Sequence, residues 1–278
     1  MLDPKIIDED VCRFLAEDVG SGDLTALVIP EEKLAKATIL TREAMLVCGQ
    51  AWVNAVFKKL DEKVVIDWQF KEGEQAYAGD TLCYLSGSAR ALLTGERAAL
   101  NMLQTLSATA SLAKQFAKAV EGTSAIVLDT RKTIPGLRLA QKYAVSCGGA
   151  SNHRVGLYDG MLIKENHIMA AGSIAKAVAA ARLSSSLVDV EVEVENLDEV
   201  KQALEAKADI LLLDNFTLEQ LREAVELNKG VAKLEASGNV NLSTIRDIAK
   251  TGVDFISVGA LTKNIQAVDL SMRVDLEA

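Results

Sequence analysis

The sequence predicts an α/β protein in two parts: an α+β part over about the first hundred residues, then a series of parallel β/α units. Three observations support this prediction. Short strand-like and helix-like runs are mixed in the first part, and a long helical run covers 95–122. After that run, most apolar strand-like segments are followed by an amphipathic helical run. Such regular alternation of strands and helices is typical of a parallel sheet.

The first part contains three strand-like runs and two helix-like runs. The strand-like runs cover 35–49, 63–70 and 81–87, and the helix-like runs cover 8–19 and 49–60. The chain has three prolines and no Ser/Gly-rich or charged low-complexity tract. Because such tracts usually form the flexible links between independent modules, the boundary between the two parts must be read from the change of pattern.

The second part repeats one pattern of strand and helix. Its strand-like segments end near Thr130, Lys164, Glu193, Asp214, Ser237 and Ser257. The last four ends are 21, 23 and 20 residues apart, which is about the length of one strand, one helix and two short loops. The helical runs that follow the strands cover 173–183, 197–207, 217–228 and 241–252.

Both an open doubly wound sheet and a closed barrel fit this rhythm. The segments LIKEN, VEVEN, LLLDN, LEASGN and ISVGA each finish an apolar run with polar or small residues. Several strands that bring polar groups to their carboxyl ends are typical of a β/α barrel, whose catalytic groups lie at that face. The sequence therefore favours a barrel over an open sheet.

Composition and charge exclude several classes of protein. Of the 278 residues 49% are hydrophobic, the net charge is -9 and the isoelectric point is near 4.9, so neither nucleic acid nor an anionic membrane is the expected partner. The acidic N-terminus lacks the features of a secretory signal, and no apolar run is long enough to span a membrane. The cysteines form no C-x-x-C pair, and we expect a reducing cytoplasm.

One segment reverses the negative charge of the chain. Residues 131–164 contain six basic side chains and one acid, Asp159, so the segment carries +5 and the remainder carries -14. Arg138 and Lys142, four residues apart, could simply form the solvated face of a helix. Arg131, Lys132 and Lys164 follow apolar strands, where a binding role for carboxylate or phosphate is favoured. His153 could be a core histidine or the partner of an acid.

Two loops after late strands predict a phosphate site. LEASGN and ISVGA each place Ser and Gly before a helical run, and free backbone N–H groups at such a position bind phosphate. Each loop alone could be an ordinary helix cap. Two such loops in successive units favour phosphate, because late loops of barrels often hold it.

The segment VDVEVEVEN (188–196) alternates valine with glutamate, so Glu191, Glu193 and Glu195 point to one side of a strand. These carboxylates could face water at a sheet edge or could ring the mouth of a barrel. Glu193 and Asp214 end successive strands beside the expected phosphate loops. Carboxylates next to a phosphate site usually hold Mg²⁺, so the sequence predicts a functional Glu193.

These motifs together resemble the quinolinate phosphoribosyltransferase family. The resemblance rests on EDVGSGDLT, LLTGERAALNMLQTLSATAS, the long segment from LDTRKTIPG to LIKENHI, VEVEVEN, LLLDN, LEASGN and FISVGALT, and it covers nearly the whole chain. It implies an N-terminal α/β sandwich domain (1–106) and an incomplete parallel β/α barrel (107–267), with the tail 268–278 packing back on the first domain. It also implies a homodimer in which each barrel mouth faces the partner's N-terminal domain.

The resemblance implies phosphoribosyl transfer from phosphoribosyl pyrophosphate to quinolinate, with decarboxylation and Mg²⁺ as the cofactor. Lys132, Glu193 and Asp214 would be catalytic, and the two acids would serve the ribose and the metal, directly or through water. Arg97 would come from the partner subunit. Quinolinate would be bound by Thr130, Arg131, Lys132, His153, Arg154 and Lys164, and phosphate by Ser237, Gly238, Asn239, Ser257, Val258 and Gly259.

Ala150 is a departure from this resemblance, since a third glycine is expected at that position. The alternative within the fold is the phosphoribosyltransferase-like protein of molybdenum transport operons, with a different acceptor. An aldolase with a Schiff base on Lys132 or Lys164, and a phosphosugar-binding barrel without turnover, are further alternatives. The neighbouring arginines disfavour the aldolase, and the retained acids disfavour the inactive barrel.

Overall fold

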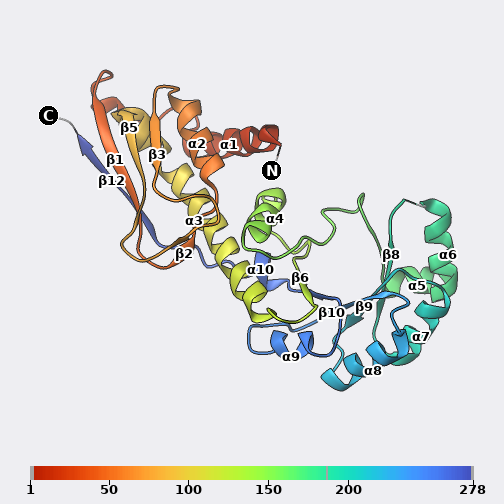
Figure 1. Cartoon of the computed structure of the whole chain (residues 1–278). Helices are drawn as coiled ribbons and strands as arrows, with labels where there is room; N and C mark the ends of the chain where they lie inside the picture. Colours follow the sequence, from red (N-terminus) through yellow and green to blue (C-terminus); the bar gives the residue numbers. More distant parts are fainter. Residues whose placement is uncertain (1–2, 186, 277–278) are drawn as a thin grey trace. The chain divides into compact units, whose positions relative to one another are not determined.

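The protein is described by a computed structural model over residues 3–185 and 187–276 (Figure 1). The first two residues of the predicted N-terminal domain and the last two of the predicted tail lie outside this range. The chain forms two compact units. The first consists of Met1–Ala113, Leu139–Gly148 and Ile265–Ala278, and the second of Lys114–Arg138 and Gly149–Asn264.

The first unit is built on a four-stranded antiparallel sheet. Its order is β12-β1-β5-β3, with β12 at Leu270–Leu276, β1 at Leu34–Thr41, β5 at Thr81–Ser88 and β3 at Val65–Trp68. The short strands β2 (Met45–Leu46) and β4 (Gln75–Ala76) form a separate pair. Side chains alternate between exposed and buried along the first half of β1, so one face of this sheet covers a core.

Two helices of this unit begin at residues suited to a helix start. In α1 (Pro4–Asp18), the carboxylate of Asp3 accepts a hydrogen bond from Lys5 N at 2.9 Å, and proline occupies the first turn. The second helix, α2 (Gln50–Leu60), follows Gly49, whose φ of 116° is one that side chains rarely adopt. A short 3₁₀ turn, η1, covers Ala26–Val28.

The long helix α3 (Ala89–Ala119) begins earlier than the sequence predicted. Leu92 is fully buried, so the residues before Gly95 have an apolar anchor inside the helix. Glycine is needed at position 95 because a Cβ atom there would lie 2.7 Å from the ring of Phe57. Arg97 therefore lies well inside the helix, whereas a helix that began at Gly95 would place it near the start, where its charge would oppose the helix dipole.

The second unit contains a six-stranded parallel sheet, as predicted. Its order is β6-β11-β10-β9-β8-β7, which leaves β6 and β7 at the two edges, as in an incomplete barrel. The strands are β6 (Ile126–Leu128), β7 (Met161–Ile163), β8 (Val190–Val194), β9 (Ile210–Asp214), β10 (Lys233–Ser237) and β11 (Phe255–Ser257). The last three end at the residues that the sequence indicated, and the α/β fold class is confirmed.

The helices of the second unit follow the strands (Figure 1). They are α5 (Glu165–Ala171), α6 (Ile174–Ser184), α7 (Leu197–Glu205), α8 (Leu218–Asn228), α9 (Ile245–Ala249) and α10 (Ala260–Lys263). Side chains of Ser173, Asn196 and Thr217 cap α6, α7 and α8. Across the described ranges, no helix combines the length and the apolar character needed to cross a membrane.

Helix α9 is shorter than the predicted run 241–252. The carboxamide oxygen of Asn241 accepts hydrogen bonds from Ser243 N (2.9 Å) and Thr244 N (3.2 Å). This local turn competes with helix formation, so the helix begins only at Ile245. Helix α4 (Arg138–Cys147), most of which belongs to the first unit, corresponds to the run that contains Arg138 and Lys142.

The two faces of strand β8 have different environments. Val190, Val192 and Val194 are fully buried on the side of the strand that packs against α6 and α7. Glu191 and Glu193 point the other way, into cavities on the inner face of the sheet. Glu191 and Glu193 therefore line the interior of the incomplete barrel and do not form a sheet edge in water.

Candidate active site

A cavity of about 370 Å³ lies at the carboxyl ends of the parallel strands. Four of its lining residues, Glu193, Asp214, Ser237 and Ser257, come from the ends of β8, β9, β10 and β11. Of the residues predicted from sequence, the structure brings ten to this cavity: Thr130, Arg131, Lys132, His153, Arg154, Lys164, Glu193, Asp214, Ser237 and Ser257. Leu162, Leu212 and Glu235 also line it and were not predicted.

The segment after β6 holds its basic residues by local hydrogen bonds. Thr130 Oγ1 accepts a hydrogen bond from Lys132 N at 3.1 Å, and Thr262 Oγ1 donates to Lys132 O at 2.8 Å. A Cβ atom on Gly259 would lie 3.3 Å from Lys132 Cδ, so the loop after β11 approaches this lysine closely. Thr130 and Gly259 thus limit where Lys132 can lie.

Arg138 has a structural role near the cavity, which the sequence left open. Its guanidinium donates to Arg131 O at 3.2 Å, to Val155 O at 3.1 Å and to Thr133 Oγ1 at 3.1 Å. Arg138 therefore joins the two chain segments that carry Arg131 and Arg154. Lys142, which could have been solvated, is buried with an exposed fraction of 3%.

Arg154 is a half-buried cation in a positively charged neighbourhood. Burial, and then the charge of Arg131, lower the pKa of Arg154 from its usual value. Its guanidinium donates to Gly160 O at 3.1 Å, which fixes the side chain along the 154–160 loop. Two neighbouring guanidinium groups create a site for an anion with more than one oxygen.

Asp129 organises the segment before Arg154, and the sequence analysis missed it. This fully buried residue follows β6. Its carboxylate accepts hydrogen bonds from Asn152 Nδ2 at 2.7 Å and from His153 N at 2.9 Å. In the same segment Gly149 has a φ of 88°, and Ala150 is buried. The left-handed backbone conformation is therefore at Gly149, next to the position where a third glycine was expected.

The three glutamates of β8 and its end have different environments. Glu191 is buried, and Glu193 has a side chain that is 16% exposed and paired with Lys164, which follows the neighbouring strand β7. Glu195 is exposed, and its backbone N–H donates to Glu199 Oε2 at 2.8 Å. Of these three glutamates only Glu193 lines the cavity at the carboxyl ends of the strands and is also partly exposed. The predicted role of Glu193 beside a phosphate site requires both properties.

Glu193 and Asp214 supply an oxygen donor set that suits Mg²⁺. They end the neighbouring strands β8 and β9, and both line the same cavity. Asp214 Oδ2 accepts a hydrogen bond from Asn215 Nδ2 at 2.8 Å, which orients the carboxylate. Mg²⁺ binds hard oxygen ligands, often through one or two carboxylates together with substrate phosphates, so these residues fit the metal implied by the family resemblance.

The Ser/Gly loop after β10 is packed tightly against Asn215. Gly238 has a φ of 98°, and a Cβ atom there would lie 2.2 Å from Asn215 Oδ1. Asn239 has a φ of 50°, and its Nδ2 lies 3.5 Å from Asn215 Oδ1. The loop conformation therefore depends on glycine at position 238. In the loop after β11, Val258 is buried and its N–H donates to Leu128 O at 2.9 Å.

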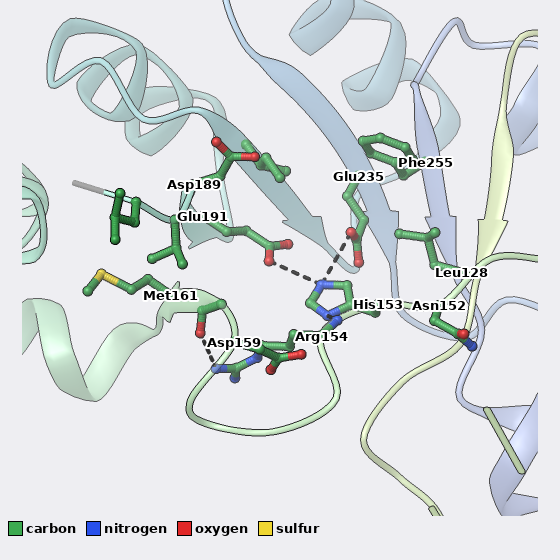
Figure 2. Close-up of a pocket in the computed structure, with 14 residues that line it drawn as sticks. Leu128, Asn152, His153, Arg154, Asp159, Met161, Asp189, Glu191, Glu235 and Phe255 are labelled. Atoms are coloured by element: carbon green, nitrogen blue, oxygen red, sulfur yellow. Dashed lines mark hydrogen bonds and ion pairs between the residues drawn. The ribbon is translucent and has the colours of Figure 1, made fainter. Parts of the chain in front are cut away.

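A second cavity, of about 440 Å³, opens toward the amino ends of the strands (Figure 2). Met161, Ile210 and Phe255, the first residues of β7, β9 and β11, line it. Both cavities are lined by His153, Arg154 and Glu235. These three residues thus form part of the wall between the two cavities.

His153 lies between two buried glutamates in Figure 2. Its Nε2 is 3.1 Å from Glu191 Oε2 and 3.5 Å from Glu235 Oε2. Its Nδ1 accepts a hydrogen bond from Arg154 N at 2.8 Å. Glu235 is 1% exposed, and burial followed by the charge of Glu191 raises its pKa to about 7. The partner of His153, which could not be assigned from the sequence, is a pair of acids next to its Nε2.

Arg97 belongs to the first unit, on α3. Its side chain is 59% exposed, and the guanidinium lies 3.9 Å from the carboxylate of Glu96, its neighbour in sequence. An exposed pair at that distance contributes little to stability. The local structure of the chain therefore gives no reason for an arginine at this position.

Comparison with known families matches nearly the whole chain. The family described as "Quinolinate phosphoribosyl transferase, C-terminal domain" matches residues 109–273, and the corresponding N-terminal domain matches residues 23–107. The chain is 39% identical to the probable nicotinate-nucleotide pyrophosphorylase [carboxylating] of Bacillus subtilis over 95% of this chain and 92% of that protein. It is also 39% identical to the chloroplastic nicotinate-nucleotide pyrophosphorylase [carboxylating] of Arabidopsis thaliana, over 95% and 81% of the two chains.

Solved structures give the same result. The nicotinate-nucleotide pyrophosphorylase from Francisella tularensis superimposes with a TM-score of 0.95 and 48% identity, over 99% of this chain and 98% of that one. NadC from Streptococcus pyogenes superimposes with a TM-score of 0.95 and 39% identity, over 100% and 99% of the two chains. Similarity over both units at these identities extends to the family as well as the fold.

Proposed function

This chain belongs to the quinolinate phosphoribosyl transferase family, and from that premise we propose that it transfers the phosphoribosyl group of phosphoribosyl pyrophosphate to quinolinate. The products are nicotinate mononucleotide, pyrophosphate and CO₂, in NAD biosynthesis. The observation that carries the proposal is one cavity lined by two guanidinium groups, two lysines and the carboxylates of Glu193 and Asp214. The alternative of a molybdenum-operon protein with a different acceptor receives no support from the comparisons.

The basic residues Arg131, Arg154 and Lys164 of the cavity bind quinolinate, which has two adjacent carboxylates. Arg131 and Arg154 each present a planar fork of N–H donors, and Lys164 adds a third cation. Arg138 and Asp129 hold the backbone segments that carry the two arginines, so these groups need little rearrangement when the ligand enters. A pocket arranged in advance for four carboxylate oxygens leaves donors unpaired when an acid with one carboxylate binds.

The acidic residues of the cavity, Glu193 and Asp214, act on the ribose. Departure of pyrophosphate from C1 leaves positive charge on that carbon, and the carboxylates of Glu193 and Asp214 stabilise it. Lys132 balances the growing negative charge of the leaving group, and the Ser237–Asn239 and Ser257–Gly259 loops hold phosphate. The close packing of Gly238 on Asn215 supports a fixed loop at the phosphate side.

The decarboxylation follows from the bond that the transfer makes. The ring nitrogen of quinolinate attacks C1 of the ribose, and the nitrogen becomes positively charged. The bond from C2 to its carboxylate then breaks, CO₂ leaves, and the electron pair stays on C2 next to the charged nitrogen until a proton replaces it. The arginines that held this carboxylate release a neutral molecule.

We propose Mg²⁺ as the metal of this reaction, held by Glu193 and Asp214 directly or through water and ribose hydroxyls. The support is the chemistry of the donor set, two carboxylates at neighbouring strand ends. When bound, the ion supplies positive charge that neutralises the pyrophosphate. Lys164 balances the charge of Glu193 in the free protein.

We also propose that the protein works as a homodimer that shares its active sites, with Arg97 of each subunit completing the dicarboxylate pocket of the other. The support is the resemblance, together with an exposed arginine whose local contact is weak. The substrates are small molecules, with no role for nucleic acid or a membrane. All four cysteines are free thiols, which fits the cytoplasm that we propose as the location.

One assay tests the proposed function. Purified protein receives phosphoribosyl pyrophosphate, Mg²⁺ and either quinolinate or nicotinate, and released CO₂ and the nucleotide product are measured. We expect turnover of quinolinate and, with nicotinate, a rate lower by several orders of magnitude, because polar groups arranged for the second carboxylate remain unpaired. Comparable rates with the two acids would contradict the proposal.

A further inference from the structure

We propose that Glu191 and Glu235 are positioning residues for the dicarboxylate pocket: they hold the imidazole of His153 in one tautomer and orientation, and His153 in turn fixes the backbone of Arg154. The inference rests on the proposed function, because it concerns the binding of quinolinate by Arg154. Neither glutamate needs to touch the substrate for this role.

The hydrogen bonds of His153 decide its tautomer. Nδ1 accepts a hydrogen bond from Arg154 N at 2.8 Å, so Nδ1 carries a lone pair and no proton. The ring proton must then be on Nε2, which faces Glu191 Oε2 at 3.1 Å and Glu235 Oε2 at 3.5 Å. A histidine whose one nitrogen donates to a carboxylate and whose other nitrogen accepts has a fixed ring orientation.

The protonation of His153 also bears on whether this group of residues could bind a metal ion. One histidine and two glutamates with ligand atoms within 4.8 Å of one another could hold a metal ion. A metal needs the lone pair of Nε2, and that nitrogen is protonated when Nδ1 accepts the Arg154 N–H. The hydrogen bonding therefore assigns the cluster to orientation of the ring and not to a metal.

The two carboxyl groups have four oxygen atoms, whereas the ring of His153 offers them a single N–H donor. Glu191 and Glu235 are 5% and 1% exposed, and Oε1 of each has no hydrogen-bond partner among the described residues. Two adjacent buried carboxylates are costly when both are charged. A proton kept by Glu235, whose pKa is raised to about 7, relieves this cost and lets Glu235 donate to Glu191. Glu191 then accepts from both neighbours.

Other charged groups surround this cluster on both sides. Asp159, from the 151–160 segment, and Asp189, which precedes β8, line the larger cavity, and Arg154 lines both cavities. Lys164, Glu193 and Asp214 lie in the cavity at the carboxyl ends, with Arg131 and Lys132 from the loop after β6. The ionisable groups that shift the pKa of Glu235 directly are Glu191 and His153.

Loss of the carboxyl pair would release the ring without releasing the whole segment. Asp129 still accepts the backbone N–H of His153 at 2.9 Å and still holds Asn152. Without an acceptor at Nε2, the imidazole can turn or move its proton to Nδ1, and the Arg154 N–H then loses its acceptor. The expected result is a poorly placed Arg154 in a folded protein.

Steady-state kinetics of the full-length enzyme give the first test, with Glu195→Gln as a matched control at an exposed position near the same strand. Glu191→Gln removes the charged acceptor, and we expect the KM for quinolinate to rise about tenfold, because a hydrogen bond to a charged group contributes more than 1.4 kcal/mol. The KM for phosphoribosyl pyrophosphate is expected to stay within about twofold of wild type. Equal effects on both KM values would overturn the proposal.

Glu235→Gln and Glu235→Leu form a second pair of variants. A glutamine amide can donate to Glu191 as the protonated carboxyl does, so Glu235→Gln is expected to keep the wild-type KM for quinolinate within about twofold. Leucine fills similar space without a donor, and it is expected to raise this KM as Glu191→Gln does. If glutamine and leucine have the same effect, the two residues only fill space and the proposal fails.

Nitrogen-15 NMR of the imidazoles tests the proposal without substrate. The chain has two histidines, and His167→Gln leaves the signal of His153 alone. We expect the Nε2–H tautomer in this background and its loss when Glu191→Gln is added. A proton on Nδ1 of His153 in the folded protein would overturn the inference. Since this measurement needs no turnover, it separates failure of the positioning role from failure of the proposed function.

Discussion

Lys164 and Glu193 form an ion pair in the cavity at the carboxyl ends of the strands. Lys164 follows β7 and Glu193 lies near the end of β8, and these two strands are hydrogen-bonded neighbours. One side chain is assigned here to the dicarboxylate and the other to the ribose and metal. In the free protein each residue is thus the counter-ion of the other.

Glu193→Gln is expected to lower turnover on the order of a hundredfold with little loss of stability. The change keeps the shape of the side chain and removes the charge that stabilises the ribose cation. The ion pair with Lys164 is partly exposed, and such pairs contribute at most about 1 kcal/mol to folding. Initial rates and thermal melting check the two parts.

Glu195→Gln is the control for Glu193→Gln, because Glu195 is exposed beyond the end of β8. It is expected to retain wild-type turnover. Normal Mg²⁺-dependent turnover in Glu193→Gln would remove Glu193 from the mechanism.

Arg154→Ala and Lys164→Ala are expected to weaken the binding of quinolinate more than that of phosphoribosyl pyrophosphate. Arg154 precedes β7 and Lys164 follows it, whereas the loops assigned to phosphate follow β10 and β11, which are not neighbours of β7 in the sheet. Loss of a charged hydrogen-bond donor is expected to reduce quinolinate affinity about tenfold or more. Titration calorimetry with each ligand measures this, and Arg222→Ala on the outer helix α8 is the control. Preferential loss of phosphoribosyl pyrophosphate binding would mean that the two subsites are assigned in reverse.

Mixed dimers test the shared site. Arg97→Ala and Lys132→Ala chains, each inactive alone, are co-expressed in equal amounts and allowed to pair at random. Half of the dimers are mixed, and one of the two sites in each mixed dimer combines an intact Arg97 with an intact Lys132. Roughly a quarter of wild-type activity is therefore expected to return in an isologous dimer. No recovery of activity would show that each site is built from one chain.

The pH dependence of stability tests the buried position of Glu235. Its pKa is raised from 4.5 to about 7 in the folded protein, so folding takes up protons between these values. Stability contributed by this group is complete below pH 4.5 and is lost as the pH rises through about 7. Glu235→Gln has no such proton, so its stability is expected to fall less than that of wild type between pH 5 and pH 8. Urea unfolding at the two pH values measures the difference.

Glu226→Gln, an exposed change on α8, is the control for this comparison. It is expected to preserve the wild-type dependence on pH. If Glu235→Gln also preserves it, Glu235 is charged in the folded protein near neutral pH, and the proton assigned to it is absent.

The β/α repeat and most of the cavity were predictable because they depend on short-range patterns. Strand ends at Asp214, Ser237 and Ser257 were indicated by polar residues directly after apolar runs. In a parallel sheet such ends meet at one edge, so the pattern also placed their side chains together. The start of α3 was missed because the packing of Gly95 against Phe57 depends on residues distant in sequence.

Asp129 and Glu235 show why part of the site could not be predicted. Each is a single acid within or just after an apolar run, a pattern that does not say whether the carboxylate meets water or a partner. Their partners come from the segment 151–154, which no periodicity connects to β6 or β10. Sequence spacing gives the face of a strand, whereas the partner of a buried charge depends on which loop covers that face.

The pairing of β12 with β1 affects how the protein is made. Strand β1 is among the first elements to leave the ribosome, and most of the chain is translated before β12 follows. Until then β1 is an edge of its sheet, with a row of backbone N–H and C=O groups that another chain could pair with. Chains truncated between Asn264 and Leu270 would thus have a complete second unit but an open first sheet, and such products are expected to aggregate through β1.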